Sequence, residues 1–211
     1  DVLTLTATPI PRTLYMAMTG IRDMSTIMTP PEQRLPVQTV VCQQDDRIVA
    51  AAISNEIQRG GQAYYLHNRI ASIGKTLAKL QDLVPDANFA AAHGQMDEHE
   101  LEDVMSKFLG GSIDVLVCTT IVQSGIDIPN ANTIIIERAD RFGLAELYQL
   151  RGRVGRWIRQ AFAYFLLPRH MILAGGARER IAAIRRYTQL GAGFRLAMRD
   201  MEIRGVGNLL A

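Results

Sequence analysis

The sequence predicts an α/β fold in which a parallel sheet is flanked by helices and followed by a C-terminal helical hairpin. Three observations predict it. Short apolar runs rich in β-branched residues alternate with longer helix-like segments, these segments end at glycine or before proline, and the strand-like runs are apolar throughout. The alternation favours βαβ units, and strands that are apolar throughout are typical of a parallel sheet buried on both faces.

The strand-like runs give the order of the predicted sheet. The first, residues 2–6, leads into a helix that is started by proline and has Thr8 as its predicted N-cap. The proline-rich stretch 29–36 breaks the rhythm and predicts an extended linker. Further strands are predicted at residues 37–42, 62–66, 88–92, 114–119, 133–137 and 161–167.

Helices are predicted between these strands, at residues 47–59, 71–83, 98–109 and 144–150. Glycine pairs or a proline follow the first three of them, as helix stop signals do. After Pro168 two helix-like segments, 177–190 and 194–201, flank a glycine-containing break. The predicted organisation is therefore a fragment at 1–28, the linker at 29–36, an α/β core at 37–168 and a helical hairpin with a loop at 169–211.

Composition narrows the class of protein. The chain has 211 residues, 48% of them hydrophobic, which is enough for a normal core. It contains no apolar run near the roughly 18 residues that span a bilayer and no signal-peptide pattern at its start. Two cysteines, Cys42 and Cys118, do not make a disulfide scaffold, so we expect a reduced, cytoplasmic protein.

The net charge of +2 conceals an asymmetry along the chain. From Arg138 onward there are 14 Lys and Arg against 5 Asp and Glu, a net +9, and the preceding residues hold 9 against 16, a net −7. Such asymmetry raises the expectation of a polyanionic partner, although unevenly spread solvated charge explains it equally well.

The octad at 149–156, Gln-Leu-Arg-Gly-Arg-Val-Gly-Arg, is the most informative motif. It presents Arg151, Arg153 and Arg156 among glycines. Arginine is suited to bidentate contact with phosphate oxygens. Each glycine inside a helix costs about 1 kcal/mol, so two in one turn indicate a close approach to the backbone. The octad therefore predicts an element that faces phosphate.

Polar residues gather in the loops after two predicted strands, where ligands of open parallel sheets bind. Thr119 and Thr120 can hold a backbone phosphate of a nucleic acid, Gly125 permits a tight turn, and Asp127 can orient a ribose hydroxyl or an arginine. The alternative for this loop is an Asx-type turn closed by Pro129.

The loop after the predicted strand 88–92 offers a second candidate nucleic-acid contact. His93 and Gln95 flank a glycine there. The alternative for His93 is an ordinary turn histidine. No Cys/His cluster has metal-ligand spacing, so we expect no bound structural metal, and no Ser-His-Asp arrangement can be argued from the spacing.

Taken in order, the motifs resemble those of superfamily 2 helicases. Thr6-Ala-Thr8 resembles motif III, residues 118–129 resemble motif V, and the octad resembles motif VI. The combination resembles the double-stranded DNA translocases, the family of the transcription-repair coupling factors and the RecG helicases. Residues 132–140 and 200–205 are more similar to the coupling-factor type.

The resemblance implies a RecA-like motor lobe that closes on ATP and Mg²⁺ held mainly by another lobe. Arg156 is then the candidate arginine finger, Arg153 contacts the same phosphate and Gln149 couples the site, while Gly125 and Asp127 complete the ATP-facing set. An arginine finger contributes about 10³–10⁵ in rate in phosphoryl transfer.

The resemblance also implies DNA-binding and coupling residues. The candidates for gripping the DNA backbone are Thr119, Thr120, His93 and Gln95, and those for coupling are Thr6, Thr8 and Arg204. Residues 1–28 would end a first RecA-like lobe, 37–168 would form the second, and 169–211 would be the translocation motif.

The implied partners are double-stranded DNA and, through domains absent here, RNA polymerase and an excision-repair damage-recognition protein in the bacterial cytoplasm. The 211 residues contain no Gly-x-x-x-x-Gly-Lys-Ser/Thr loop and no DEEQ- or DEAH-like motif, so we expect the chain alone not to hydrolyse ATP. Gln123-Ser124 and Trp157 depart from the family pattern. A RecG-type parent and a non-enzymatic binding module are the alternatives.

Overall fold

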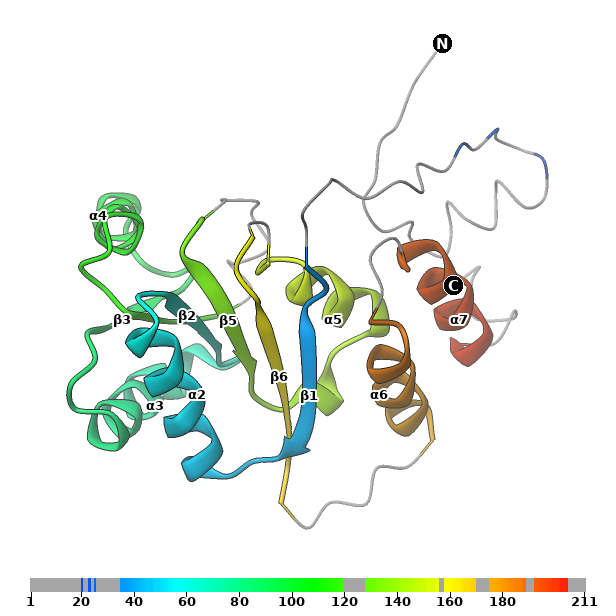
Figure 1. Cartoon of the computed structure of the whole chain (residues 1–211), viewed down its shortest axis with the longest axis horizontal. Coiled ribbons are helices and arrows are strands. Elements are labelled where there is room, and N and C mark those ends of the chain that lie inside the picture. The colour runs from blue at the N-terminus through cyan, green and yellow to red at the C-terminus, as the bar shows by residue number, and fades with distance from the viewer. Residues whose placement is uncertain are drawn as a thin grey trace.

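A computed structural model shows an α/β domain followed by two helices (Figure 1). It describes Gly20, Asp23 and Ser25 and residues 35–119, 128–155, 158–169, 175–188 and 192–204. The predicted strand at 2–6 and most of the predicted linker lie outside these residues. In the described part, no helix is long and apolar enough to cross a membrane.

The sheet has six strands, all parallel, in the order β1-β6-β5-β2-β4-β3. The strands are β1 Gln38–Gln43, β2 Gln62–Leu66, β3 Phe89–Ala92, β4 Val115–Cys118, β5 Ala131–Ile136 and β6 Phe162–Leu167. Each coincides with a predicted strand to within about two residues at its ends, as boundary assignments allow. The predicted parallel α/β fold is confirmed.

The helices also agree with the prediction. They are α2 Asp46–Gln58, α3 Ile70–Leu83, α4 Glu98–Leu109, α5 Leu144–Arg151, α6 Gly176–Arg186 and α7 Gly193–Arg204, with a short 3-10 helix η2 at Ala139–Arg141. Asp45 and Asp97 cap α2 and α4, because each side chain accepts a hydrogen bond from a first-turn amide.

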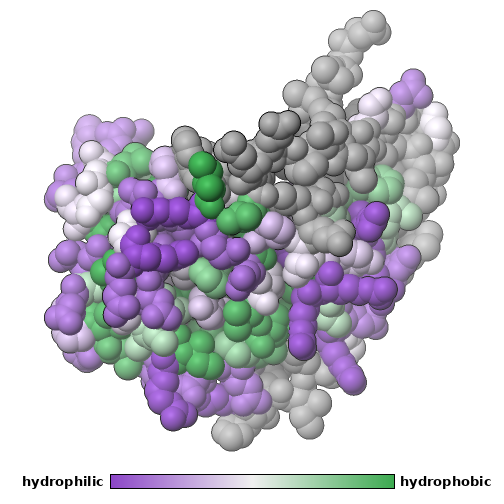
Figure 2. All heavy atoms as spheres, in the orientation of Figure 1, coloured by the Kyte–Doolittle hydropathy of each residue, from purple (hydrophilic) through white to green (hydrophobic). Residues whose placement is uncertain are grey.

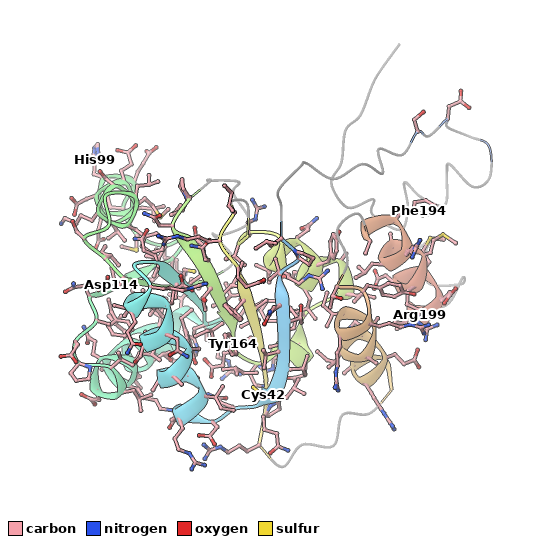
Figure 3. All side chains as sticks on the ribbon, viewed as in Figure 1. Cys42, His99, Asp114, Tyr164, Phe194 and Arg199 are labelled. Atoms are coloured by element: carbon pink, nitrogen blue, oxygen red, sulfur yellow. The ribbon has the colours of Figure 1, made fainter. Side chains whose placement is uncertain are left out.

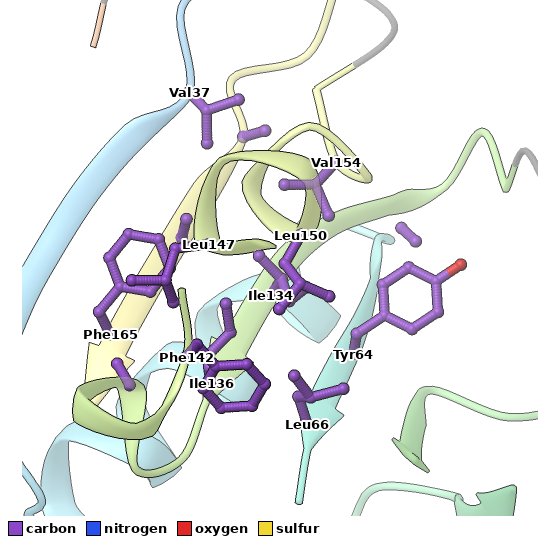
Figure 4. Packing of buried hydrophobic residues seen from close by; sticks show 14 of the residues in the cluster. Val37, Tyr64, Leu66, Ile134, Ile136, Phe142, Leu147, Leu150, Val154 and Phe165 are labelled. Atoms are coloured by element: carbon purple, nitrogen blue, oxygen red, sulfur yellow. The ribbon is translucent and has the colours of Figure 1, made fainter. Parts of the chain in front are cut away.

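Alternate residues of each central strand enter cores on opposite faces of the sheet. In β2, Tyr64 and Leu66 pack in one core with α5 and α4, and Ala63 and Tyr65 pack in the other with α2 and α3. Figure 4 shows the first core, where Leu147 and Leu150 of α5 lie over Ile134 and Ile136 of β5. Helices therefore cover both faces, as the apolar strands predict.

Burial on both faces holds for β2, β4 and β5 and not for β1, β3 and β6. Every residue of β2, β4 and β5 is buried, whereas most of β1 and β3 is partly exposed. The prediction of uniformly buried strands is therefore wrong for β1, for β3 and for half of the residues of β6, whose side chains the helices cover only in part. Figure 2 shows hydrophilic side chains over much of the outer surface, with small apolar areas between them.

The C-terminal helices pack onto the sheet domain through α5. Both α6 and α7 contact α5 and each other. Ile181 and Ile184 of α6 and Leu196 of α7 join the core that contains α5. This confirms the predicted helical hairpin, although α6 ends at Arg186, earlier than the predicted residue 190.

Candidate functional site

The site residues that the structure describes divide between the two edges of the sheet. Since all six strands are parallel, their carboxyl ends share one edge and their amino ends the other. Helix α5 begins beyond the carboxyl end of β5, and the segment after it reaches Gly155, which packs against Val37 and Ala161 at the amino ends of β1 and β6. The described end of the octad therefore reaches the amino edge, whereas the described residues of the loops after β3 and β4 lie at the carboxyl edge.

The first arginine of the octad does not face a phosphate. Arg151 is only 4% exposed, and its guanidinium donates to the carbonyl oxygens of Ile184 at 3.1 Å and Tyr187 at 2.7 Å while lying over the ring of Tyr148. Burial lowers the pKa of Arg151 from its ordinary value. The prediction of three phosphate-facing arginines is wrong for Arg151, which instead bonds the last turn of α6 to α5.

The octad glycines are approached closely, as predicted, but by the protein itself. Gly155 has φ +75°, and a Cβ there would lie 2.9 Å from Val37 Cγ2 and from Ala161 Cβ. A Cβ on Gly152 would lie 3.3 Å from the carbonyl oxygen of Gln149. Gly155 therefore lets the turn after α5 pass over the ends of β1 and β6, while Gly152 is close only to carbonyls of α5, and a ligand is not needed to explain either glycine.

Two other octad residues lie around the end of α5. Gln149 is exposed on its last turn, and Arg153 is partly buried in the turn that follows, where its amide donates to Leu150. The structure thus keeps Gln149 and Arg153 close to each other. The predicted site residues that lie outside the described part are Arg156, Gly125, Asp127, Thr120, Thr6 and Thr8, together with the side chain of Arg204.

The predicted DNA-binding residues meet at the carboxyl edge. His93 follows β3 and Thr119 follows the neighbouring strand β4, where the amide of Thr119 donates to the carbonyl of Ala92 at 3.3 Å. Thr119 is buried, and Gln95 is exposed. His93 Nδ1 is buried with no hydrogen-bond partner among the described residues. The structure therefore brings these loops together, and their contact with DNA stays a prediction.

A crevice that the sequence reasoning missed opens farther along the same edge. It has a volume of about 540 Å³. Residues that directly follow β1, β2, β5 and β6 line it, together with residues of α2, α3 and η2. The available signal was the set of polar and charged residues just after the apolar runs 62–66 and 131–136, His67-Asn68-Arg69 and Glu137-Arg138.

A hydrogen-bonded pair joins two strands inside this crevice. His67 Nδ1 lies 2.5 Å from Glu137 Oε2, and His67 Nε2 lies 2.8 Å from the hydroxyl of Ser72. Burial raises the pKa of Glu137, but the hydrogen bonds from His67 and Gln44 outweigh burial and hold it below its ordinary value. Burial and the nearby Glu137 charge raise the pKa of Tyr65. Glu137 is therefore an anion held between β5 and β2.

A metal centre finds no support in the described residues, where no group of three or more His, Cys, Asp or Glu side chains is placed to hold an ion. The chemistry that this part of the chain offers is therefore that of arginines, hydroxyls and backbone amides. These are groups that bind phosphate.

Comparison with known proteins agrees with this architecture. Residues 45–158 match the helicase conserved C-terminal domain. The chain is 36% identical to RecG in its structure bound to a three-way DNA junction, with a TM-score of 0.76 over 95% of this chain and 27% of that one. It also shares its fold with Saccharomyces cerevisiae Dbp5 at 16% identity and a TM-score of 0.62, over 87% of this chain and 48% of that one.

Curated relatives extend the match over all of the sequence. The chain is 58% identical over 210 residues to the transcription-repair-coupling factor of Staphylococcus haemolyticus and 57% identical to that of Staphylococcus aureus. Each match spans 100% of this chain and 18% of the length of the relative. The resemblance to coupling factors, with RecG as a near relative, is thereby confirmed. The chain belongs to the helicase conserved C-terminal domain family.

Proposed function

We propose that the chain is the second RecA-like motor lobe of an ATP-dependent double-stranded DNA translocase of the coupling-factor type. The translocase would displace stalled RNA polymerase and couple transcription to nucleotide excision repair. The observation that carries the proposal is 58% identity to a transcription-repair-coupling factor across 210 residues.

The position of the described end of the octad, at the sheet edge opposite the loops of His93 and Thr119, supports a motor lobe. In the proposal, the octad directs Arg156 and Arg153 to the γ-phosphate of ATP, with Gln149, Gly125 and Asp127 completing that surface. The loops with His93, Gln95, Thr119 and Thr120 grip the DNA backbone. Separate surfaces for nucleotide and DNA let closure on one ligand change the position of the other.

The contact between α5 and the C-terminal hairpin supports coupling. Arg151 bonds α6 directly to the helix that carries the start of the octad. Movement of the octad on ATP hydrolysis would therefore be transmitted to α6 and α7. Thr6, Thr8 and Arg204 are the further coupling residues in this proposal.

ATP and Mg²⁺ would be held mainly by the other motor lobe, since the sequence lacks a phosphate-binding loop. We therefore expect no ATP hydrolysis by the purified 211-residue chain, with or without DNA. Phosphate release is the measurement. Robust DNA-stimulated turnover by this chain alone would contradict the proposed division between lobes.

Substitutions in the longer protein test the octad and the tail separately. Arg156→Ala should lower ATP hydrolysis by about 10³-fold or more and leave ATP binding intact, as loss of an arginine finger does. Arg159→Ala is the matched control, because Arg159 is exposed and, within the described residues, its side chain donates to the carbonyls of Arg59 and Gly60. Arg204→Ala should keep hydrolysis and abolish translocation. Equal loss of both activities in the Arg204 variant would argue against its coupling role.

A RecG-type fork-reversal motor is the second candidate, favoured by the structural match to RecG at 36% identity. The two candidates act on different substrates. Displacement of RNA polymerase stalled on linear DNA, without reversal of a model fork, would support the coupling-factor type, and the opposite pattern would support the RecG type. A chain that binds nucleic acid or protein within a parent lacking any ATPase activity would be a binding module instead.

A further inference from the structure

The crevice lies at the point where the connections of the sheet change direction. From β2 the chain passes through α3 toward β3 at one edge, and from β5 it passes through α5 toward β6 on the other side. Strands β2 and β5 are neighbours, and α3 and α5 cover opposite faces. In open parallel sheets, ligands bind outside the carboxyl ends of the two strands at such a switch point.

The lining of this crevice carries more positive than negative charge. Its basic residues are Arg69, Lys79, Arg138, Arg141 and Arg169, and its acidic residues are Asp46 and Glu137. The polar side chains of Gln44, Asn68 and Ser72 also line it. The lining therefore offers hydrogen bonds together with an excess of cations.

Pairing within the protein neutralises only part of this charge. Lys79 lies 2.6 Å from Asp46, and Arg138 forms a two-pronged bond to Asp140 just behind the crevice. Glu137 is paired with His67.

Three arginines remain at the crevice. Within the described residues, Arg69, Arg141 and Arg169 form no salt bridge with a carboxylate, and only Arg169 donates a side-chain hydrogen bond, to the carbonyl of Gln44. All three are exposed. The charge of Arg169 acts on the nearby Asp45 and that of Arg141 on Asp140, so part of this charge is balanced. The excess of cations over carboxylates in the lining still attracts an anion.

The amino terminus of α3 adds to this attraction. Arg69 is the N-cap of this 14-residue helix and makes no side-chain capping bond. The Ser72 amide donates to the carbonyl of Arg69 at 3.2 Å, so the amides that can meet a ligand are those at the very start of the helix, where the helix dipole places partial positive charge. Arginines beside an uncapped helix start are the combination that binds phosphate.

We propose that this crevice is a phosphate-binding site, formed by Arg69, Arg141, Arg169 and the start of α3, and separate from the octad. The ligand is a phosphate-bearing group, supplied either by a small molecule of nucleotide size or by a nucleic-acid backbone. The volume of the crevice, about 540 Å³, lies within the range of small-molecule sites. The site rests on its own lining and holds whether or not the octad serves ATP.

Nuclear magnetic resonance of the chain locates the site directly. The sequence has four histidines, and His67 lies in the crevice while His99 lies on the outer side of α4 with its side chain 94% exposed (Figure 3). Titration with inorganic pyrophosphate, and separately with a short DNA duplex, should shift the ring signals of His67 and leave those of His99 in place. If neither probe shifts His67 more than His99, the proposal is wrong.

Matched charge variants give the second test. Arg69→Gln with Arg141→Gln should weaken binding of the effective probe by at least about tenfold, since losing one charged hydrogen bond costs that much. Arg185→Gln with Arg186→Gln removes the same charge from exposed positions of α6 and should change affinity less than about threefold. Equal weakening by both double variants would overturn the proposal, because binding would then depend on net charge alone.

The two probes identify the source of the phosphate. If the variant with Arg69→Gln and Arg141→Gln loses affinity for pyrophosphate and keeps its affinity for DNA, the ligand is a small molecule. If it loses DNA affinity beyond the α6 control, the phosphate comes from the nucleic-acid backbone. Neither result depends on ATP hydrolysis, so failure of the motor proposal and failure of this one are separable.

Discussion

Replacing Arg151 by methionine tests the bond between the octad helix and the C-terminal hairpin. Methionine is unbranched and about as long as the aliphatic stem of arginine, so it keeps the packing of that stem and removes the guanidinium. In the native structure, that group makes hydrogen bonds of 3.1 Å and 2.7 Å to two carbonyls at the end of α6. The substitution leaves both carbonyls without this donor.

The expected loss follows from these contacts. A hydrogen bond from a charged donor contributes about 1.5–3 kcal/mol, and removing one partner exposes the desolvation cost of the other. The cation–π contact with Tyr148, at 5.0 Å, adds roughly 0.5–2 kcal/mol. Removing a guanidinium that is costly to bury offsets part of the loss. We expect Arg151→Met to lower the free energy of unfolding by about 2–4 kcal/mol.

Urea denaturation of the chain measures the total, and amide hydrogen exchange shows where stability is lost. Exchange should accelerate first in α6, whose last turn Arg151 holds, while the amides of β5 keep their protection. Arg186→Met is the control, since Arg186 is exposed on the same helix. A change below about 0.5 kcal/mol, or an α6 that exchanges no faster than in the wild type, would refute the reasoning.

Two further predictions concern the turn after α5 and the crevice. Gly155→Ala should destabilise the fold by about 2–4 kcal/mol, because φ is +75° and the new Cβ would lie 2.9 Å from Val37 Cγ2. Gly111→Ala, at φ +78° in open space, should cost only about 1 kcal/mol by urea denaturation, and equal costs would contradict the packing argument. Glu137→Gln should be less stable than the wild type by about 1–3 kcal/mol at pH 7. Folding lowers the pKa of Glu137 below 4.5, so its contribution is present above that pH and is lost as the pH falls through the folded value. Denaturation at pH 7 and at a series of lower pH values checks this, and a difference that stays constant down to the pH at which the wild type itself unfolds would exclude the His67 pairing as its cause.

The order of the elements could be predicted because its signals are local. Apolar runs and helix stops at Gly60 and Gly110 act over a few residues, and the described strands and helices follow them closely. The ordered motifs also identify the family without any structure. The loops of His93 and Thr119 were predicted to act together, and pairing of β3 with β4 places them side by side.

The role of an individual side chain could not be predicted where it depends on contacts distant in sequence. Arg151 has the same chemistry as Arg153, yet it is buried because α6, more than 30 residues later, packs over α5 and presents its carbonyls. Position 155 likewise requires glycine in part because a Cβ there would collide with Val37, which lies at the start of the domain sequence. No local pattern carries this information.

The sequence alone accounts for the α/β class, the run of strands and helices and the helicase-type motifs, because periodicity and turn chemistry are properties of neighbouring residues. Only the tertiary structure decides which strands are neighbours. The pairing of β2 with β5 creates the switch point, gathers Arg69 and Arg141 at one crevice and places His67 against Glu137, 70 residues away. Strand order is set by the packing of both cores together, and so the crevice exists only in the folded chain.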